Sequence, residues 1–198
     1  MDIVFDLGGV VVKWEPETIV AKCFADSETR ARVQREIIMH PDWLELDRGT
    51  LSQEAAAERA ARRTGLAEAA VLDFLRQVPE ELVAVPETVA LMERLNSAGH
   101  RLYCLSNMAF ASIEHLEKAY DFWELFIGRV ISCRLNLCKP ESAIYEYLLK
   151  TYDLIAEGTL FIDDIEANLT AAAQLGIQTI RFESPSQCER ELRRRGHI

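Results

Sequence analysis

Charged and polar side chains follow apolar segments at four places along this chain. They are Asp6, the pair Ser106 and Asn107, Lys139, and the pair Asp163 and Asp164. Carboxylates supply the hard oxygen ligands that Mg²⁺ prefers, and an ammonium group with neutral hydrogen-bond donors suits an anionic phosphate. The residue types therefore predict chemistry on a phosphate ester held together with a divalent metal.

Strands that alternate with helices must bring these groups together. Apolar strands are predicted at residues 3–5, 102–105, 129–132, 160–162 and 177–182, and helices at 87–98, 110–119, after Pro140 and at 166–175. Such alternation predicts an α/β fold, a doubly wound, Rossmann-like parallel sheet covered on both faces. Ligands bind beyond the carboxyl ends of the strands in such sheets, so the four places converge on one site.

Residues 18–78 interrupt this alternation directly after the first strand. The stretch is rich in alanine and charged residues, is punctuated by Gly49 and Gly65, and shows a helical pattern without a strand. Ser52 precedes one of these helices as its expected N-cap. We therefore predict a Rossmann-like core of residues 1–17 and 79–198, with an α-helical cap of residues 18–78 inserted after the first strand.

The composition of the chain limits the classes of partner that it can bind. The 198 residues carry a formal charge of −10, and the longest basic run is the tail at residues 193–195, so we expect no nucleic-acid partner. The first residues are acidic where a signal peptide is basic, and no apolar run reaches the roughly 18 residues of a spanning helix. The five cysteines form no metal-type or redox-type pair. We expect a cytoplasmic protein without a membrane partner; its oligomeric state is unknown from the sequence.

Four short motifs resemble those of the haloacid dehalogenase-like (HAD) hydrolase superfamily. They occupy residues 5–10, 105–107, 139–140 and 161–169, and the resemblance extends from residue 3 to about residue 182. The last motif and residues 47–52 are most similar to a branch that includes bacterial α-glucose-1-phosphate phosphatases and the phosphatase domain of soluble epoxide hydrolase. The resemblance implies a Mg²⁺-dependent phosphatase for small phosphorylated metabolites, with sugar phosphates and glucose 1-phosphate in particular as the leading substrates.

The resemblance also implies roles for four catalytic residues. Asp6 would be the nucleophile that forms an aspartyl-phosphate, which divides one difficult displacement into two easier ones. Ser106 and Asn107 would donate hydrogen bonds to the transferring phosphoryl oxygens. Lys139 would neutralise charge on the nucleophile and the phosphate.

A metal site is implied at the same place. The carboxylates of Asp6 and Asp164 and the backbone carbonyl of Gly8 would bind Mg²⁺. Asp163 would not bind the ion directly but would orient water that is bound to it. Adjacent carboxylates repel one another unless a cation lies between them, which supports this interpretation. Asn168 is either a hydrogen-bond donor to these acids or an ordinary polar residue in the first turn of a helix.

Gly8 departs from the pattern of most phosphatases in the superfamily, which have a second aspartate two positions after the nucleophile. That aspartate is a general acid and base, a role worth about 10² to 10⁴ in rate. We therefore expect slow turnover, proton transfer assisted by the substrate, or a proton donor from elsewhere. The alternatives are a 2-haloacid dehalogenase that uses the same nucleophile, and a phosphate-binding or regulatory protein with little catalysis.

The predicted cap would select the substrate. Four residues are candidates for contacts to the leaving group: Trp14 near the start of the cap, and Trp43, Asp47 and Arg48 inside it. Trp43 could instead anchor the core of the cap, and Arg48 could be a solvated charge or an ion-pair partner of Asp47. A cap of this length predicts a small substrate that can be enclosed away from water.

Overall fold

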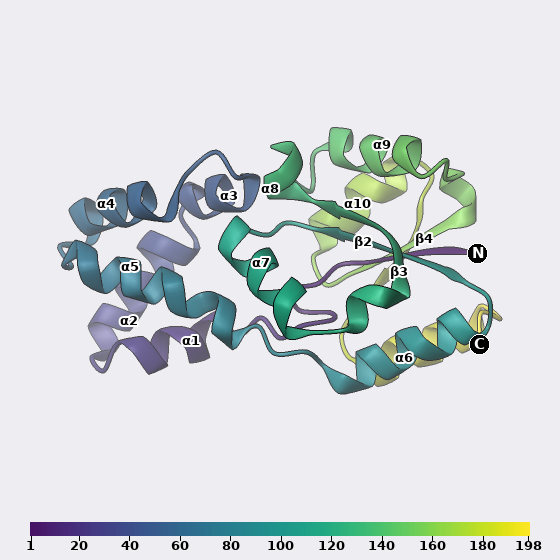
Figure 1. Ribbon diagram of the computed structural model, residues 1–198, viewed down its shortest axis with the longest axis horizontal. Coiled ribbons are helices and arrows are strands. Elements are labelled where there is room, and N and C mark those ends of the chain that lie inside the picture. Colours follow the sequence, from purple (N-terminus) through teal and green to yellow (C-terminus); the bar gives the residue numbers. More distant parts are fainter.

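The computed structural model describes residues 1–198 and contains one sheet of five strands, all parallel. The strands are β1 (Asp2–Phe5), β2 (Arg101–Ser106), β3 (Phe126–Ile131), β4 (Thr159–Asp163) and β5 (Gln178–Arg181). Their order across the sheet is β3-β2-β1-β4-β5 (Figure 1). The first strand is thus central, and the chain winds outward from it in both directions, which confirms the predicted α/β class.

Eleven α-helices surround or extend this sheet. Helix α6 (Pro86–Ser97) directly precedes β2. The helices that follow β2 are α7 (Phe110–Ala119), α8 (Ser132–Leu135), α9 (Ser142–Thr151), α10 (Glu166–Gln174) and α11 (Pro185–Arg194). Those that directly follow β1 are α1 (Pro16–Cys23), α2 (Ser27–Val33), α3 (Pro41–Arg48), α4 (Gln53–Thr64) and α5 (Glu68–Gln77). A π-helical turn, η1 (Gln34–Ile38), continues α2, and a 3₁₀ turn, η2 (Val78–Glu81), follows α5. None of these helices is both long enough and apolar enough to cross a membrane.

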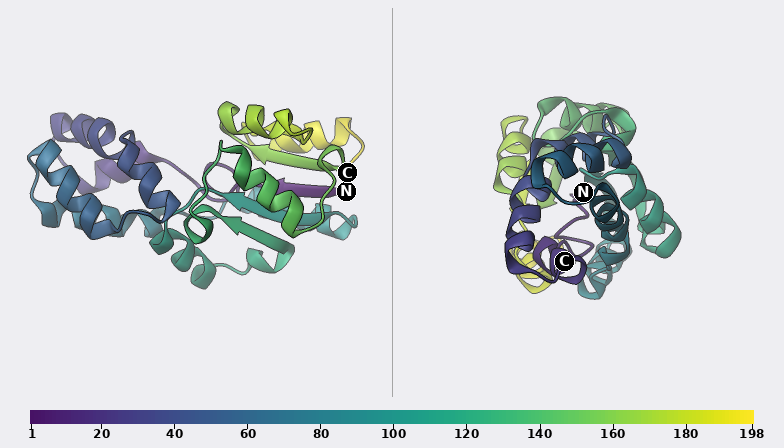
Figure 2. Two further views of the ribbon diagram at one scale, coloured as in Figure 1. Left: turned by 90° about the horizontal axis from the view of Figure 1, so that it is seen from above. Right: turned by 90° about the vertical axis from the view of Figure 1, so that its left-hand side faces the viewer.

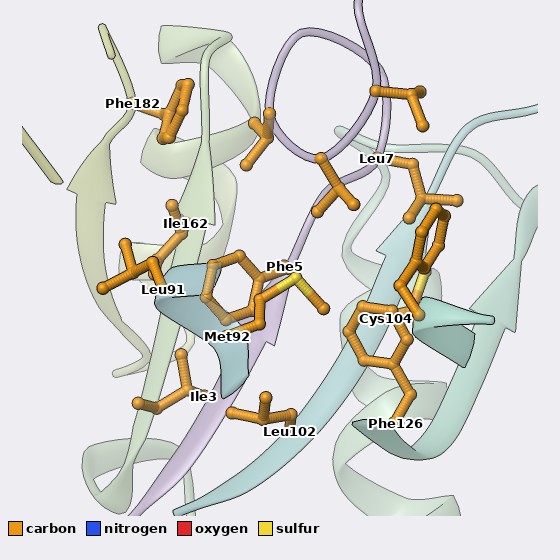
Figure 3. Packing of buried hydrophobic residues seen from close by; sticks show 14 of the residues in the cluster. Ile3, Phe5, Leu7, Leu91, Met92, Leu102, Cys104, Phe126, Ile162 and Phe182 are labelled. Atoms are coloured by element: carbon orange, nitrogen blue, oxygen red, sulfur yellow. The ribbon is translucent and has the colours of Figure 1, made fainter. Parts of the chain in front are cut away.

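Both faces of the sheet are buried, because alternate side chains of β1 enter different hydrophobic clusters. Ile3 and Phe5 pack with residues of α6 and α11, among them Leu91 and Met92, and Figure 3 shows Met92 beside Phe5. Val4 points to the opposite face, where it joins residues of α9 and α10. The carboxyl end of β1 is therefore held rigidly between two packed layers.

Helices α1 to α5 form a helical lobe with a hydrophobic cluster of its own, in which Val33, Ala57 and Phe74 are fully buried. Figures 1 and 2 show this lobe beyond the carboxyl ends of the strands. It contains no strand, and the hydroxyl of Ser52 accepts the N–H of Ala55 at 3.2 Å as the expected N-cap of α4. Helix α1 begins at Pro16, two residues before the predicted start of the cap; the division at residues 18 and 78 stays a prediction.

The end of α3 is fastened to α8 and the segment that follows it, and we call these contacts the α3–α8 clamp. The Ser132 hydroxyl donates to the Asp47 carbonyl at 2.5 Å, and the Asn136 amide donates to the Arg48 carbonyl at 2.9 Å. Gly49 ends α3 with φ +78°, and a Cβ there would lie 2.5 Å from the Cys133 carbonyl oxygen. Only glycine combines this φ with such a close approach.

Two predicted elements have other bounds in the structure, and one helix was not predicted. The strand expected at 129–132 is β3, which spans Phe126–Ile131 and includes Gly128, a weak strand residue; a Cβ at Gly128 would overlap the ring of Tyr152. The helix expected from Pro140 begins at Ser142. Helix α11 was not predicted, although Ser184 is its N-cap and Pro185 its first residue, a typical helix start.

Replacement of Gly49 by alanine tests the α3–α8 clamp. Gly65 ends α4 with a similar φ of +73°, but no atom lies within 4 Å of the place that an added Cβ would take, so Gly65→Ala is the matched control for the backbone cost. We expect Gly49→Ala to lower the free energy of unfolding by about 1–3 kcal/mol more than Gly65→Ala, which is the usual range for overpacking. Urea denaturation measures both; equal losses would show that the close approach carries no energy.

Candidate active site

The register of the sheet brings three of the predicted motifs to one edge. Phe5 is paired with Cys104 of β2 and with Ile162 of β4, so the next residues along β1 and β4 are Asp6 and Asp163. Ser106 ends β2 at the same edge. Lys139 arrives from the loop between α8 and α9, and its ammonium lies between the two carboxylates.

Asp6 is buried, and every hydrogen bond to its side chain comes from a motif residue or its direct neighbour. Its Oδ1 accepts the Leu7 N–H and the Ser106 hydroxyl, each at 2.7 Å. Its Oδ2 lies 2.8 Å from Nζ of Lys139. The carboxylate is therefore fixed in one orientation at the end of β1.

Lys139 is equally buried and forms a second ion pair with Oδ2 of Asp163 at 2.7 Å. Burial lowers the pKa of this ammonium, but the carboxylates of Asp6 and Asp163 outweigh burial and raise it, so Lys139 is charged. Burial, together with the charge of Asp163, raises the pKa of Asp6 to about 7, although Lys139 and Ser106 act in the opposite direction. Three acids and one lysine leave the site with an excess of negative charge.

Both carboxylate oxygens of Asp163 accept hydrogen bonds. Its Oδ1 accepts the Ile165 N–H at 2.8 Å, and the amide of Asn168 donates to both of its oxygens at 3.0 and 3.1 Å. The Tyr145 hydroxyl in turn donates to the carbonyl of Asn168 at 2.9 Å. Of the two interpretations of Asn168, the structure supports the donor to the acids.

A divalent cation fits the three acids. Asp6, Asp163 and Asp164 each offer a carboxylate oxygen within 4.8 Å of the others, and Oδ1 of Asp164 is buried without a hydrogen-bond partner. Burial and the neighbouring Asp163 raise the pKa of Asp164. A buried carboxylate oxygen without a partner is costly, and a hard cation would remove this cost.

Gly9 borders the cluster of three acids, and sequence reasoning missed it. It has φ +76°, and a Cβ at this position would overlap the carboxylate of Asp164. Only glycine allows this approach between the turn after β1 and the end of β4. The adjacent Gly8-Gly9 pair marked the turn in the sequence, but the close contact with Asp164 lies 155 positions away and had no local signal.

Two of the predicted phosphate donors are engaged inside the protein. The Ser106 hydroxyl donates to Asp6, so its one proton is directed at the predicted nucleophile. The Asn107 side chain donates to the Lys139 carbonyl at 2.9 Å and accepts the Lys139 N–H at 2.8 Å. The Asn107 amide thus holds the backbone of Lys139. Its second N–H takes no part in these bonds and Asn107 lines the cavity described below, so its role as a donor to the phosphoryl group stays a prediction.

A cavity of about 390 Å³ lies above these residues, between the sheet edge and the helical lobe. Asp6, Gly8, Asn107, Lys139 and Asn168 form its polar floor. Its apolar wall consists of Trp14, Trp43, Leu44, Val78, Leu82, Met108, Pro140 and Ile165. The rings of Trp14 and Trp43 are 5.5 Å apart between centroids, so these two candidates do meet at the cavity.

Arg48 lies elsewhere. Its guanidinium forms two hydrogen bonds to the carboxylate of Glu141, at 3.0 and 2.5 Å, and it is absent from the cavity wall. Arg48 therefore pairs with Glu141 and not with Asp47, and a contact of Arg48 to the leaving group stays a prediction without support from the cavity lining. Arg48 is instead a part of the α3–α8 clamp, where the bidentate pair joins the lobe to the segment before α9.

A family model described as haloacid dehalogenase-like hydrolase matches residues 3–176. The chain belongs to the haloacid dehalogenase-like hydrolases. This HAD hydrolase is 26% identical over 174 residues to the sesquiterpene phosphatase astK of Aspergillus oryzae, with 88% of this chain and 85% of that protein covered. It is also 26% identical to the D-ribitol-5-phosphate phosphatase of Bacteroides thetaiotaomicron, over 96% of each chain.

Solved structures show the fold of the HAD hydrolase. A HAD family enzyme of Bacteroides thetaiotaomicron, BT-2542, in complex with magnesium and inorganic phosphate matches with a TM-score of 0.69 at 18% identity, over 91% of this chain and 92% of that one. Dehalogenases also have this fold. The fold alone does not distinguish the two chemistries, so the residues of the site must do so.

Metal binding is testable without any substrate. We expect Mg²⁺ at about ten times its dissociation constant to stabilise the protein by about 1.4 kcal/mol, because it binds only the folded chain. For a chain of this size that corresponds to a rise in Tm of about 3–6 °C, measured by differential scanning calorimetry.

Asp164→Asn should abolish this rise, because it removes the charge of the carboxylate whose Oδ1 lacks a partner. Asp73→Asn on the exposed side of α5 makes the same change in net charge and should keep the full rise. An equal rise in all three proteins would contradict a metal site at Asp164.

Proposed function

We propose that this HAD hydrolase is a Mg²⁺-dependent phosphatase that hydrolyses small phosphate monoesters through an aspartyl-phosphate on Asp6. One observation carries the proposal: Asp164 places a buried, unpartnered carboxylate oxygen beside Asp6 and Asp163, although Lys139 already neutralises part of their charge. Such a donor set favours a divalent cation, and Asp6, Asp164 and the Gly8 carbonyl would hold it. When bound, Mg²⁺ supplies positive charge that attracts the phosphate and stabilises the charge of the transition state.

Asp6 would attack phosphorus as the bond to the leaving oxygen breaks. The hydrogen bonds from Leu7 and Ser106 keep this carboxylate oriented for an in-line approach. Lys139 would balance the charge that passes between the Asp6 carboxylate and the phosphoryl oxygens. Water would then hydrolyse the aspartyl-phosphate, which regenerates Asp6 and releases phosphate.

Hydrolysis of a carbon–halogen bond, the first alternative, needs the nucleophile but no divalent cation. It would give no reason for a buried Oδ1 atom of Asp164 that lacks a hydrogen-bond partner next to Asp163. The third possibility, a phosphate-binding protein with little turnover, predicts that phosphate is trapped on Asp6. Both alternatives are outcomes of the assay below.

The cavity wall supports a choice among phosphate esters. Glucose 1-phosphate remains the prediction from resemblance, but the wall around the leaving group is formed mostly by tryptophan and aliphatic side chains, and Arg48 is turned away from it. The two related phosphatases act on a sesquiterpene and on a polyol phosphate by their names, so relatives leave both classes open. The apolar wall favours leaving groups that bury hydrocarbon.

Asp6→Asn tests the chemistry. We expect the wild-type protein with Mg²⁺ to release phosphate catalytically from a panel of sugar, nucleotide, aryl and prenyl monophosphates, and to leave a 2-haloacid unchanged. Asp6→Asn should lose at least about 10³ in kcat, because it removes the nucleophile, and EDTA should suppress the wild-type rate.

The competing functions give different results in the same assay. Halide release without Mg²⁺ would establish the dehalogenase, and one phosphorylated Asp6 per chain without turnover would establish the phosphate-binding protein. Equal phosphate release by the wild-type protein and Asp6→Asn would contradict the proposed mechanism.

The apolar wall makes a separate prediction about specificity. We expect kcat/KM for an aryl or prenyl monophosphate to exceed that for glucose 1-phosphate, and Trp43→Ala to lower the former about tenfold or more through KM, since a buried aromatic contact is lost. Met39→Ala, at a largely exposed apolar side chain of the same lobe, is the control. A higher kcat/KM for glucose 1-phosphate would reverse this substrate preference.

A further inference from the structure

Asp47 is an ionisable side chain of the cavity that the proposed mechanism leaves without a role. It follows Trp43 by one turn on α3, so the two side chains share a helix face, and both line the cavity. Among the residues around this cavity, Asp6 and Asp47 are the two with carboxyl groups, and no histidine is present.

The reaction needs a proton donor that Gly8 does not provide. Lys139 is engaged with two carboxylates, and the Ser106 proton is directed at Asp6. Ser112 and the amides of Asn107 and Asn168 are too weakly acidic to protonate an alkoxide leaving group efficiently at neutral pH.

We propose that Asp47, supplied by the helical lobe, is the general acid and base of this site, in place of the aspartate that Gly8 lacks. The inference rests on the proposed phosphatase function and deepens it. It makes the lobe a part of the catalytic machinery in addition to a cover for the substrate.

Protons and bonds balance in each half of the reaction. When Asp6 attacks phosphorus, the bond between phosphorus and the ester oxygen breaks, and the Asp47 carboxylic acid gives its proton to that oxygen, so the product leaves as an alcohol. The Asp47 carboxylate then takes a proton from the water that attacks the aspartyl-phosphate. The bond between phosphorus and Asp6 breaks, phosphate leaves as its monohydrogen form, and both aspartates return to their initial states.

The backbone around Asp47 is fixed by contacts outside the lobe. Its carbonyl accepts the Ser132 hydroxyl at 2.5 Å, and Ser132 in turn accepts the Met108 N–H at 2.8 Å. Gly49, two residues later, is packed against Cys133. The α3–α8 clamp therefore fixes the backbone from which the Asp47 side chain reaches the cavity, and a proton donor requires such a fixed attachment.

The surroundings of Asp47 raise the pKa of its carboxyl group, so both the acid and the carboxylate are present near neutral pH. Burial raises its pKa to about 7, whereas the backbone N–H of Ala109 and the charge of Lys139 act in the opposite direction. The thiols of Cys133 and Cys138 also face it, and burial raises the pKa of each to about 11, so both are neutral. Asp6 lies across the same cavity, and the adjacent Arg48 is paired with Glu141.

The test compares two substrates with Mg²⁺ present. p-Nitrophenyl phosphate has a leaving group that needs no proton, whereas a primary alkyl phosphate does. For Asp47→Asn we expect the alkyl ester to react about 10² to 10⁴ more slowly. With p-nitrophenyl phosphate the variant should release one nitrophenol per chain at the wild-type rate and then slow down, because water attack on the aspartyl-phosphate has lost its base. This burst also shows that the variant is folded.

Two further variants separate a catalytic role from a structural one. Gly8→Asp in the Asp47→Asn background should restore turnover of the alkyl ester, since a Cβ at Gly8 would meet only Cβ of Trp14, at 3.9 Å. Glu45→Gln removes a carboxylate from the same helix but not from the cavity and should leave both substrates unaffected.

The pH profile provides an independent readout. In the wild-type protein, kcat/KM for the alkyl ester should fall as pH rises above about 7, because the acid is then deprotonated, and this limb should be missing in Asp47→Asn. Equal effects of Asp47→Asn on the first turnover of both substrates, or no effect on either substrate, would overturn the proposal. A wild-type protein that releases no phosphate at all would instead contradict the proposed function.

Discussion

The ammonium of Lys139, buried between the carboxylates of Asp6 and Asp163, is the interaction on which the rest of the site depends. Three carboxylates with oxygens within 4.8 Å of one another repel strongly in a medium from which water is excluded. One fixed cation offsets part of this repulsion, and the remaining negative charge would favour the binding of a metal ion. The overall charge of −10 would repel an anionic substrate, so the attraction of a phosphate ester would have to be local, from Lys139 and a bound cation.

A buried ion pair of this kind is weak support for stability by itself, because taking the charges out of water is costly. The apolar layers on both faces of the sheet offset this cost. Phe5 and Ile162 are fully buried immediately before Asp6 and Asp163, so each acid projects from a strand that cannot shift. Asn107 fixes the backbone of Lys139 and Asn168 fixes Asp163, which leaves the charged groups little freedom to move apart.

The helical lobe completes the site from the opposite side. Its contacts with the core are concentrated at the end of α3, where Asp47, Arg48 and Gly49 each meet a different part of the segment around α8 and α9. The side chains that face the cavity from this helix are apolar, apart from Asp47. In the proposed reaction the lobe would exclude water from the leaving group and present one carboxyl group to it, and this arrangement would strengthen the electrostatic interactions of the site.

The sequence by itself determined the parallel α/β sheet and the acids, serine and lysine at its edge, because strand periodicity and the polar residue after each strand are local signals. It also located Ser52 as a helix cap, and the resemblance named the family. Only the tertiary structure decided which partner each side chain takes. Arg48 pairs with Glu141 across 93 residues, the Asn107 amide binds the backbone of Lys139, and Gly9 makes room for Asp164. These contacts depend on the register of strands that are distant in the sequence and on how the helical lobe packs against the core. The pattern of residues within a short segment encodes neither the register nor this packing.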